Sequence, residues 1–301
     1  MEKEIPVILG PTASGKTALA VALARERAAE IISADSRQVY RRMDVGTGKD
    51  LAEYGSVPYH LIDVREPGEK YNLALFQDDF NEVLRKIQAR GRQAVVCGGT
   101  GLYIQGLVQG FSHTFVSENA ELRKELEALP ENELDRLLGN VRADTRKRKI
   151  RALEIAAFKK ANPAVVLPER EVYDFRLFGL DPPVPERRAR ISQRLKQRIH
   201  HEGMISEVEA LMASGVSPEM LEYYGLEYKY IARFLLGILQ YDEMYARLET
   251  EIHRFAKRQM TFFRSMEKKG IAINWIPFEL SLEEKVEYIL ASDQCPPDAA
   301  R

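Results

Sequence analysis

The chain has 301 residues, of which 45% are hydrophobic and 30% are charged, a composition typical of a globular protein with a large core. Its 44 basic and 45 acidic residues give a formal net charge of −1, so the overall charge does not favour nucleic acid and such a contact would need local clusters. No apolar run approaches the length of a membrane span, and we expect no signal peptide. The two cysteines, Cys97 and Cys295, have no metal-binding spacing. We therefore expect a cytoplasmic protein without a metal–thiolate site, and we expect it to be a monomer.

The first motif of the chain is a glycine-rich loop between an apolar run at residues 5–9 and a helix-forming stretch at residues 18–27. The loop has the Walker A pattern and consists of Gly10, Pro11, Thr12, Ala13, Ser14, Gly15, Lys16 and Thr17. Backbone N–H groups of such a loop, together with the start of the following helix, favour a bound phosphate. We expect Lys16 to reach the outer phosphate and the Thr17 hydroxyl to hold Mg²⁺. The pattern leaves the identity of the diphosphate open.

Short apolar runs alternate with amphipathic stretches through the first half of the chain. The predicted helices lie at residues 18–27 and 73–90, and the predicted strands lie at residues 7–9, 31–33, 60–64, 94–97, 175–180 and 273–276. This alternation predicts an α/β fold with a P-loop NTPase-like parallel sheet as its core. Residues 186–269 are almost entirely helical in pattern, which predicts a mostly helical insertion domain. The expected parts are a catalytic core at residues 1–182, a helical insertion at 183–250 and a C-terminal return to the core at 251–301.

Polar residues follow several of the predicted strands, and ligands of open α/β sheets bind at such strand ends. Asp35, after the second strand, could be a magnesium ligand, a proton acceptor or a helix N-cap. Asp63, in the third predicted strand, competes with Asp35 for the magnesium role or belongs to a turn. Thr100, after the fourth strand, could donate its hydroxyl to a phosphate or cap the next helix.

Several motifs in a fixed order resemble those of the bacterial tRNA dimethylallyltransferases. Besides the loop at residues 10–17, they are Asp35-Ser36-Arg37-Gln38-Val39-Tyr40, Tyr59-His60-Leu61-Ile62-Asp63, Gly98-Gly99-Thr100-Gly101-Leu102-Tyr103, Arg151-Ala152-Leu153-Glu154 and Phe255-Ala256-Lys257-Arg258-Gln259. The resemblance covers most of the chain. It implies transfer of a dimethylallyl group from dimethylallyl diphosphate to the exocyclic amine of the adenosine 3′ of a tRNA anticodon. The glycine-rich loop would then hold an isoprenoid diphosphate.

The resemblance also assigns roles to residues. It implies that Asp35 is the catalytic base, that Lys16 stabilises the leaving diphosphate, and that Thr100 lies near the diphosphate and the acceptor. Ser36, Arg37 and Gln38 would join Asp35 and Thr100 in contacting tRNA, with the Gln38 amide suited to an adenine edge. Arg123 falls where the family has a tRNA-contacting arginine, although a solvated helix face is an equal alternative.

Two basic clusters supply the local charge that tRNA binding would need. The first lies at residues 142–151 and includes Lys147, Arg148 and Arg151, and the second lies at residues 187–198. Taken alone, either cluster is typical of a solvated helix, and a tRNA substrate makes contact the better interpretation. Lys257 and Arg258 could close over the diphosphate or face water. Lys229 stands in the segment where the family has a diphosphate-binding arginine, but a lysine lacks the bidentate fork of arginine.

Other functions remain open at this stage. A P-loop kinase of a small metabolite would use Asp35 to activate a hydroxyl. An adenylate isopentenyltransferase would use a free nucleotide in place of tRNA. A nucleotide-switched binding protein would have no evident use for Asp35, and the basic clusters are too large for the small acceptors of the first two alternatives.

Overall fold

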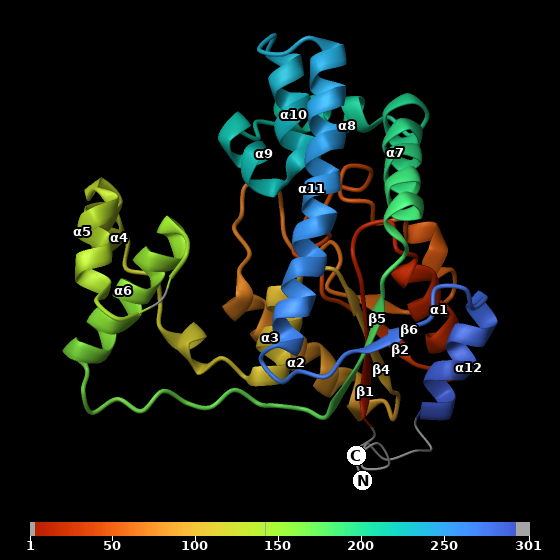
Figure 1. Cartoon of the computed structure of the whole chain (residues 1–301), viewed down its shortest axis with the longest axis horizontal. Coiled ribbons are helices and arrows are strands. Elements are labelled where there is room, and N and C mark those ends of the chain that lie inside the picture. Colours follow the sequence, from red (N-terminus) through yellow and green to blue (C-terminus); the bar gives the residue numbers. More distant parts are fainter. Residues whose placement is uncertain (1–3, 142, 293–301) are drawn as a thin grey trace. The chain divides into compact units, whose positions relative to one another are not determined.

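The computed structural model describes residues 4–141 and 143–292 (Figure 1). Two residues considered above lie outside the described residues: Cys295, and Arg142 of the first basic cluster. The fold is built on a six-stranded sheet in the order β3-β2-β4-β1-β5-β6, and every pairing in it is parallel. Its strands are β1 (Ile5–Leu9), β2 (Glu30–Ser33), β3 (Tyr59–His60), β4 (Ala94–Gly98), β5 (Phe175–Leu180) and β6 (Asn274–Ile276). This confirms the predicted α/β class and parallel sheet.

Helices cover both faces of the sheet, which explains why its central strands are continuous apolar runs. Ile8 of β1 packs in a cluster with α1 (Lys16–Glu26) and α12 (Leu282–Ser292), whereas Val7 and Leu9 pack on the other face. That other face is covered by α2 (Leu73–Ala89), α3 (Gly101–Gln109) and the long helix α11 (Tyr241–Glu267) (Figure 1). Strand alternation thus assigns neighbouring residues of β1 to two separate cores.

The third predicted strand is wrong beyond His60. Strand β3 has two residues, and the following Leu61 and Asp63 have positive φ angles of 61° and 56°. Such angles belong to turns rather than strands. The turn brings Asp63 onto the buried ammonium group of Lys49, a contact between ionic groups that the apolar pattern does not reveal.

The helices after β5 share a hydrophobic core with the helices that cover one face of the sheet. They are α7 (Val184–His200), α8 (Met204–Ala213), α9 (Pro218–Tyr224) and α10 (Leu226–Leu235), followed by α11. Their buried side chains join the same hydrophobic cluster as those of α2 and α3. Residues 1–108 and 172–301 accordingly form one compact unit, and residues 109–171 form another.

This division differs from the expected one. The segment predicted as an insertion, 183–250, lies inside the larger unit, and residues 109–171 separate from the core to which we assigned them. The smaller unit contains the 3-10 turn η2 (Ser112–Phe115) and helices α4 (Ala120–Ala128), α5 (Glu131–Leu138) and α6 (Arg146–Ala161). It has a small core of its own, formed by Leu126, Leu134 and Ile150.

One carboxylate joins the helical part of the larger unit to a loop of the α/β part. Glu207 of α8 accepts hydrogen bonds from three successive backbone N–H groups, those of Asp44 at 2.7 Å, Val45 at 2.8 Å and Gly46 at 3.0 Å. The Tyr228 hydroxyl donates a fourth hydrogen bond at 2.8 Å. Charge-assisted bonds of this kind are about twice as strong as neutral ones, so Glu207 fixes the loop that leads to Lys49 and Asp50.

Within residues 4–141 and 143–292, none of the helices has the length and apolar character needed to cross a membrane.

Candidate active site

The glycine-rich loop leaves β1 and turns into α1 as the sequence predicts. Gly15 precedes α1 with a φ of 86°, and Ala13 also has a positive φ, of 60°. Gly10 leaves room for the neighbouring strand, because a Cβ at this position would lie 2.9 Å from the Leu180 carbonyl oxygen. The Ser14 hydroxyl is buried and has no hydrogen-bond partner among the described residues. A buried polar atom without a partner is costly, and a bound phosphate would provide one.

Lys16 lies in an environment that disfavours its charge. Its ammonium group is 3.4 Å from the Pro11 carbonyl oxygen. Burial lowers the pKa of Lys16, and the nearby Cys97 and Asp35 act in the opposite direction. An anionic ligand would offset the cost of burying the charge, because it stabilises the ammonium form of Lys16. The Cys97 thiol beside it is buried, which raises its pKa to about 12, so it is a neutral wall of the site and not a nucleophile.

Gln259 of α11 holds the loop in place. Its side-chain oxygen accepts the backbone N–H of Thr12 at 2.9 Å, and its amide nitrogen donates to the Gly99 carbonyl oxygen at 2.9 Å. The neighbouring Lys257 and Arg258, which we considered as groups that close over the diphosphate, are exposed. Sequence reasoning therefore singled out the charged residues of this motif and missed Gln259, the residue that contacts the loop. The available signal was that Gln259 is a polar residue on the buried face of an amphipathic helix.

We predict that Gln259→Leu will weaken binding of the diphosphate about tenfold, because the loop loses the bond that fixes Thr12. It should also lower the free energy of unfolding by about 1–3 kcal/mol, the cost of leaving buried polar groups unpaired. Calorimetric titration with pyrophosphate and urea denaturation measure the two effects. The exposed Gln193 of α7 gives the control variant Gln193→Leu, which should change neither.

The ends of β2 and β4 are joined beside this loop. The Thr100 hydroxyl oxygen accepts the Ser36 backbone N–H at 3.0 Å and donates to the Ser36 hydroxyl at 3.3 Å. Asp35 Oδ1 accepts the Arg37 backbone N–H at 2.9 Å, a local turn that fixes the carboxylate. Asp35 also appears among the charges that raise the pKa of Lys16. The sheet therefore brings Asp35, Thr100 and Lys16 to one edge, as their positions after three strands predicted.

The side chains of Arg37 and Gln38 are engaged within the protein. Arg37 donates a short hydrogen bond to the Tyr223 carbonyl oxygen, and its guanidinium lies 5.9 Å from the centre of the Tyr223 ring. The Gln38 amide nitrogen donates to the Gly48 carbonyl oxygen at 3.1 Å, and the Gln38 oxygen accepts the Ser33 hydroxyl at 3.2 Å. To read an adenine edge, Gln38 would have to exchange these partners, so its base contact stays a prediction.

Asp63 has a different environment from Asp35. It forms a short ion pair with Lys49, whose side chain is fully buried and also contacts Asp44 at 2.5 Å and the Tyr40 carbonyl oxygen at 2.6 Å. A buried ammonium group requires such partners. Asp63 is thus committed to a structural ion pair, and Asp35 is the better candidate for a role in chemistry.

In the smaller unit, Arg123 is paired with acidic residues. Its guanidinium binds both carboxylate oxygens of Glu154, at 3.0 Å and 2.6 Å, and a carboxylate oxygen of Glu118 at 2.5 Å. The hydrogen bond to buried Glu154 raises the pKa of Arg123. A tRNA phosphate would have to compete with this bidentate pair, so the role of Arg123 in tRNA binding stays a prediction.

The first basic cluster divides into internal and external residues. Lys149 is buried and pairs with Glu131 at 2.7 Å, and Arg151 donates to the carbonyl oxygens of Val116 and His113. Lys147 and Arg148 are exposed, although Arg148 pairs with Asp144 at 2.5 Å. Among the described residues of this cluster, Lys147 and Arg148 are therefore the better placed for phosphates, whereas Arg151 stabilises the unit.

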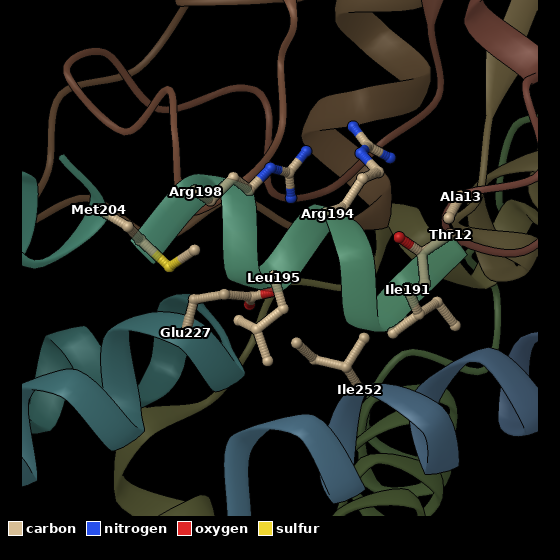
Figure 2. A pocket seen from close by; sticks show the side chains of 9 residues that line it. All are labelled: Thr12, Ala13, Ile191, Arg194, Leu195, Arg198, Met204, Glu227 and Ile252. Atoms are coloured by element: carbon tan, nitrogen blue, oxygen red, sulfur yellow. The ribbon is translucent and has the colours of Figure 1, made fainter. Parts of the chain in front are cut away.

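A pocket lies between the glycine-rich loop and α7 (Figure 2). Loop residues Thr12 and Ala13 line one end, and Arg194 and Arg198 of the second basic cluster project from α7 (Figure 2). Glu227 of α10 also lines the pocket. Lys229, two residues further along, pairs with Glu222 at 3.7 Å and is not among the residues that line this pocket.

The sequence matches two family models. A family described as IPP transferase matches residues 38–266, and one described as isopentenyl transferase matches residues 3–55. The protein called tRNA dimethylallyltransferase 2 of Phocaeicola vulgatus is 48% identical over 302 residues, which cover 96% of this chain and 98% of that protein. tRNA dimethylallyltransferase 1 of Geotalea uraniireducens is 45% identical and covers 98% of this chain and 100% of its own length.

Solved structures have the same fold. The full-length tRNA isopentenylpyrophosphate transferase of Bacillus halodurans superposes with a TM-score of 0.72 at 31% identity, with 97% of each chain covered. A eukaryotic dimethylallyltransferase acting on tRNA superposes with a TM-score of 0.74 at 22% identity, over 91% of this chain and 74% of that one, and this likeness concerns the fold alone. The family match over residues 38–266 and the near full-length relatives place the chain in the IPP transferase family, to which its tRNA dimethylallyltransferase relatives belong.

Proposed function

We propose that the protein transfers a dimethylallyl group from dimethylallyl diphosphate to the exocyclic amine of the adenosine 3′ of the anticodon in tRNA. The observation that carries this proposal is that Lys16, which follows β1, and Asp35, which follows β2, come close enough at the carboxyl ends of one parallel sheet for the Asp35 charge to act on the pKa of Lys16. The relatives that match this chain over nearly their full length are named for this activity. The expected substrates are thus tRNA and dimethylallyl diphosphate, and the expected location is the cytoplasm.

The reaction needs a leaving group and a base. The bond between C1 of the dimethylallyl group and the diphosphate oxygen breaks, and its electron pair leaves with the diphosphate. The adenine amine forms a new bond to C1 and loses a proton, which Asp35 accepts. Lys16 and the backbone N–H groups of the loop stabilise the negative charge that develops on the diphosphate. Fixing Asp35 by the Arg37 N–H keeps the base in position for this transfer.

Mg²⁺ fits the donors at the start of α1. Thr17 follows Lys16 in the first turn of the helix. Its hydroxyl oxygen is a suitable ligand, because Mg²⁺ prefers oxygen ligands and usually combines a few protein oxygens with phosphate oxygens and several water molecules. When bound, Mg²⁺ would neutralise charge on the diphosphate. The chain's own contribution would be the Thr17 hydroxyl.

Transfer of a radiolabelled dimethylallyl group tests the proposal. The purified protein is incubated with Mg²⁺, labelled dimethylallyl diphosphate and unmodified tRNA, with adenosine monophosphate and ATP in parallel reactions. We expect label on tRNA alone. Label on a free nucleotide would favour an adenylate isopentenyltransferase. The absence of transfer together with ATP consumption would favour a kinase.

A further inference from the structure

The second basic cluster contains two arginines with an unexpected location. Arg194 and Arg198 are one helical turn apart on α7 and so share a face of the helix. Both line the pocket that begins at Thr12 and Ala13 of the glycine-rich loop, and in Figure 2 both guanidinium groups lie on the side of α7 away from Leu195 and Ile252. Two arginines from a helix that lies more than 170 residues later in the sequence are thus near the phosphate loop.

Asp50 holds the two arginines in this arrangement. It forms a short ion pair with Arg194, and its Oδ2 is 3.6 Å from Arg198 Nη2. Asp50 itself has a φ of 46°, in the left-handed region, and it follows the loop that Glu207 fixes. Arg194 and Asp50 each act on the pKa of Lys16, the former lowering it and the latter raising it. The pair thus lies within electrostatic reach of the ammonium group that we assign to the diphosphate.

Arg198 has an unused donor. Only 9% of its surface is exposed, yet its Nη2 atom makes no hydrogen bond in the part of the chain that the structure describes. The 3.6 Å separation from Asp50 is too long for a hydrogen bond. Buried guanidinium donors are normally satisfied, so this unpaired donor, which lies against Gly48 and near Asp50, points to a missing acceptor.

The other acidic group in the pocket does not supply this acceptor. Burial raises the pKa of Glu227, which favours its neutral form, while the nearby Arg198 partly opposes that shift. The two arginines would therefore gain from an anion that is bound by the glycine-rich loop and receives hydrogen bonds from them. The diphosphate of the substrate has such oxygens, and arginine binds them with two parallel N–H groups.

We propose that Arg194 and Arg198 form a second set of diphosphate ligands opposite the glycine-rich loop, and that Asp50 holds Arg194 until the diphosphate arrives. Arg194 then exchanges the Asp50 carboxylate for a phosphate oxygen, and Arg198 Nη2 gains the acceptor that it lacks. The same contacts persist as C1–O bond cleavage adds charge to the diphosphate, so Arg194 contributes to catalysis as well as to binding. This inference rests on the proposed function, since it concerns the same diphosphate.

Binding of inorganic pyrophosphate in the presence of Mg²⁺ tests the assignment by isothermal titration calorimetry. Arg194→Gln should weaken binding about 10- to 100-fold, the effect of losing charged hydrogen bonds. Arg194→Lys should weaken it less, because the charge stays while the fork is lost. Asp50→Asn should tighten binding by about three- to tenfold, because the carboxylate that competes for Arg194 is gone. The exposed Arg188 on the same helix provides the matched control Arg188→Gln, which should leave the affinity unchanged.

The opposite signs separate this role from a structural one. If Arg194 merely anchored the loop at Asp50, then Arg194→Gln and Asp50→Asn would break the same ion pair and change the affinity in the same direction. That result, or unchanged affinity in Arg194→Gln, would overturn the inference. Should Arg194→Gln fail to fold, Arg194→Lys and Asp50→Asn still give the contrast.

Lys16→Ala separates failure of the inference from failure of the proposed function. Wild-type binding that is lost in Lys16→Ala but kept in Arg194→Gln would preserve the diphosphate site and reject the arginine ligands. No measurable binding of pyrophosphate by the wild-type protein, or equal binding by Lys16→Ala, would instead argue against the diphosphate site of the proposed function.

Discussion

Replacing Asp35 by asparagine is expected to lower kcat for transfer to tRNA by about 10²- to 10⁴-fold, the usual contribution of a general base. The backbone of the turn should survive, because an asparagine oxygen can still accept the Arg37 N–H. Affinities for pyrophosphate and for tRNA should therefore change little. Single-turnover transfer of labelled dimethylallyl groups, with both affinities measured separately, is the required experiment.

Asp63→Asn is the informative comparison for Asp35. Asp63 is ion-paired with buried Lys49, so its replacement should lower the free energy of unfolding by about 1–3 kcal/mol and leave single-turnover chemistry close to wild type. A large kcat defect in Asp63→Asn, together with near-normal transfer by Asp35→Asn, would reverse the assignment of the two carboxylates.

Lys16→Ala is expected to produce the second large effect, a loss of about 10²- to 10³-fold in kcat, comparable to the removal of one preorganised donor from a developing anion. The substitution should also weaken the binding of pyrophosphate, because Lys16 is the charged residue of the loop and its ammonium group is poorly solvated there. Lys16→Arg keeps the charge but not the compact shape, so partial recovery is expected. Wild-type rates in Lys16→Ala would remove Lys16 from the mechanism.

The pH dependence of binding follows from the same residue. Burial lowers the pKa of Lys16 in the free protein, and a bound diphosphate would raise it by favouring the ammonium form. Binding is then coupled to proton uptake at alkaline pH, and affinity should fall as the pH rises through the lowered pKa. Titrations of pyrophosphate at increasing pH should show this decline in the wild type and a flatter profile in Lys16→Arg, whose guanidinium stays charged.

The sequence predicted those parts of the site that local patterns encode. The glycine-rich loop, Asp35 and Thr100 each follow a short apolar strand. Because parallel strands end at one edge of the sheet, this was sufficient to predict that they lie close together. The prediction of a strand at residues 60–64 was wrong beyond His60, because the apolar residues continue into a turn that is fixed by the contact between Lys49 and Asp63. Apolar pattern does not report such ionic contacts.

Residues that act through distant partners were beyond sequence reasoning. Gln259 was part of a recognised motif, but its contacts with Thr12 and Gly99 depend on how α11 packs against the loop. Arg194 was one of several similar cations in a cluster, and its position beside the loop follows from the packing of α7. Charge counts cannot separate it from the exposed Arg188, because exposure is set by tertiary structure.

The bond between Gln259 and Thr12 has a consequence for the order in which the enzyme is made. The glycine-rich loop leaves the ribosome well before its partner, because Gln259 follows Thr12 by 247 residues. The loop at residues 44–46 likewise waits 161 residues, counted from Gly46, for Glu207. Contacts between such distant residues close late in folding. A nascent chain that ends before Gln259 would contain the entire phosphate motif and still lack the bond that fixes it, so the loop reaches its final conformation only after α11 has been synthesised.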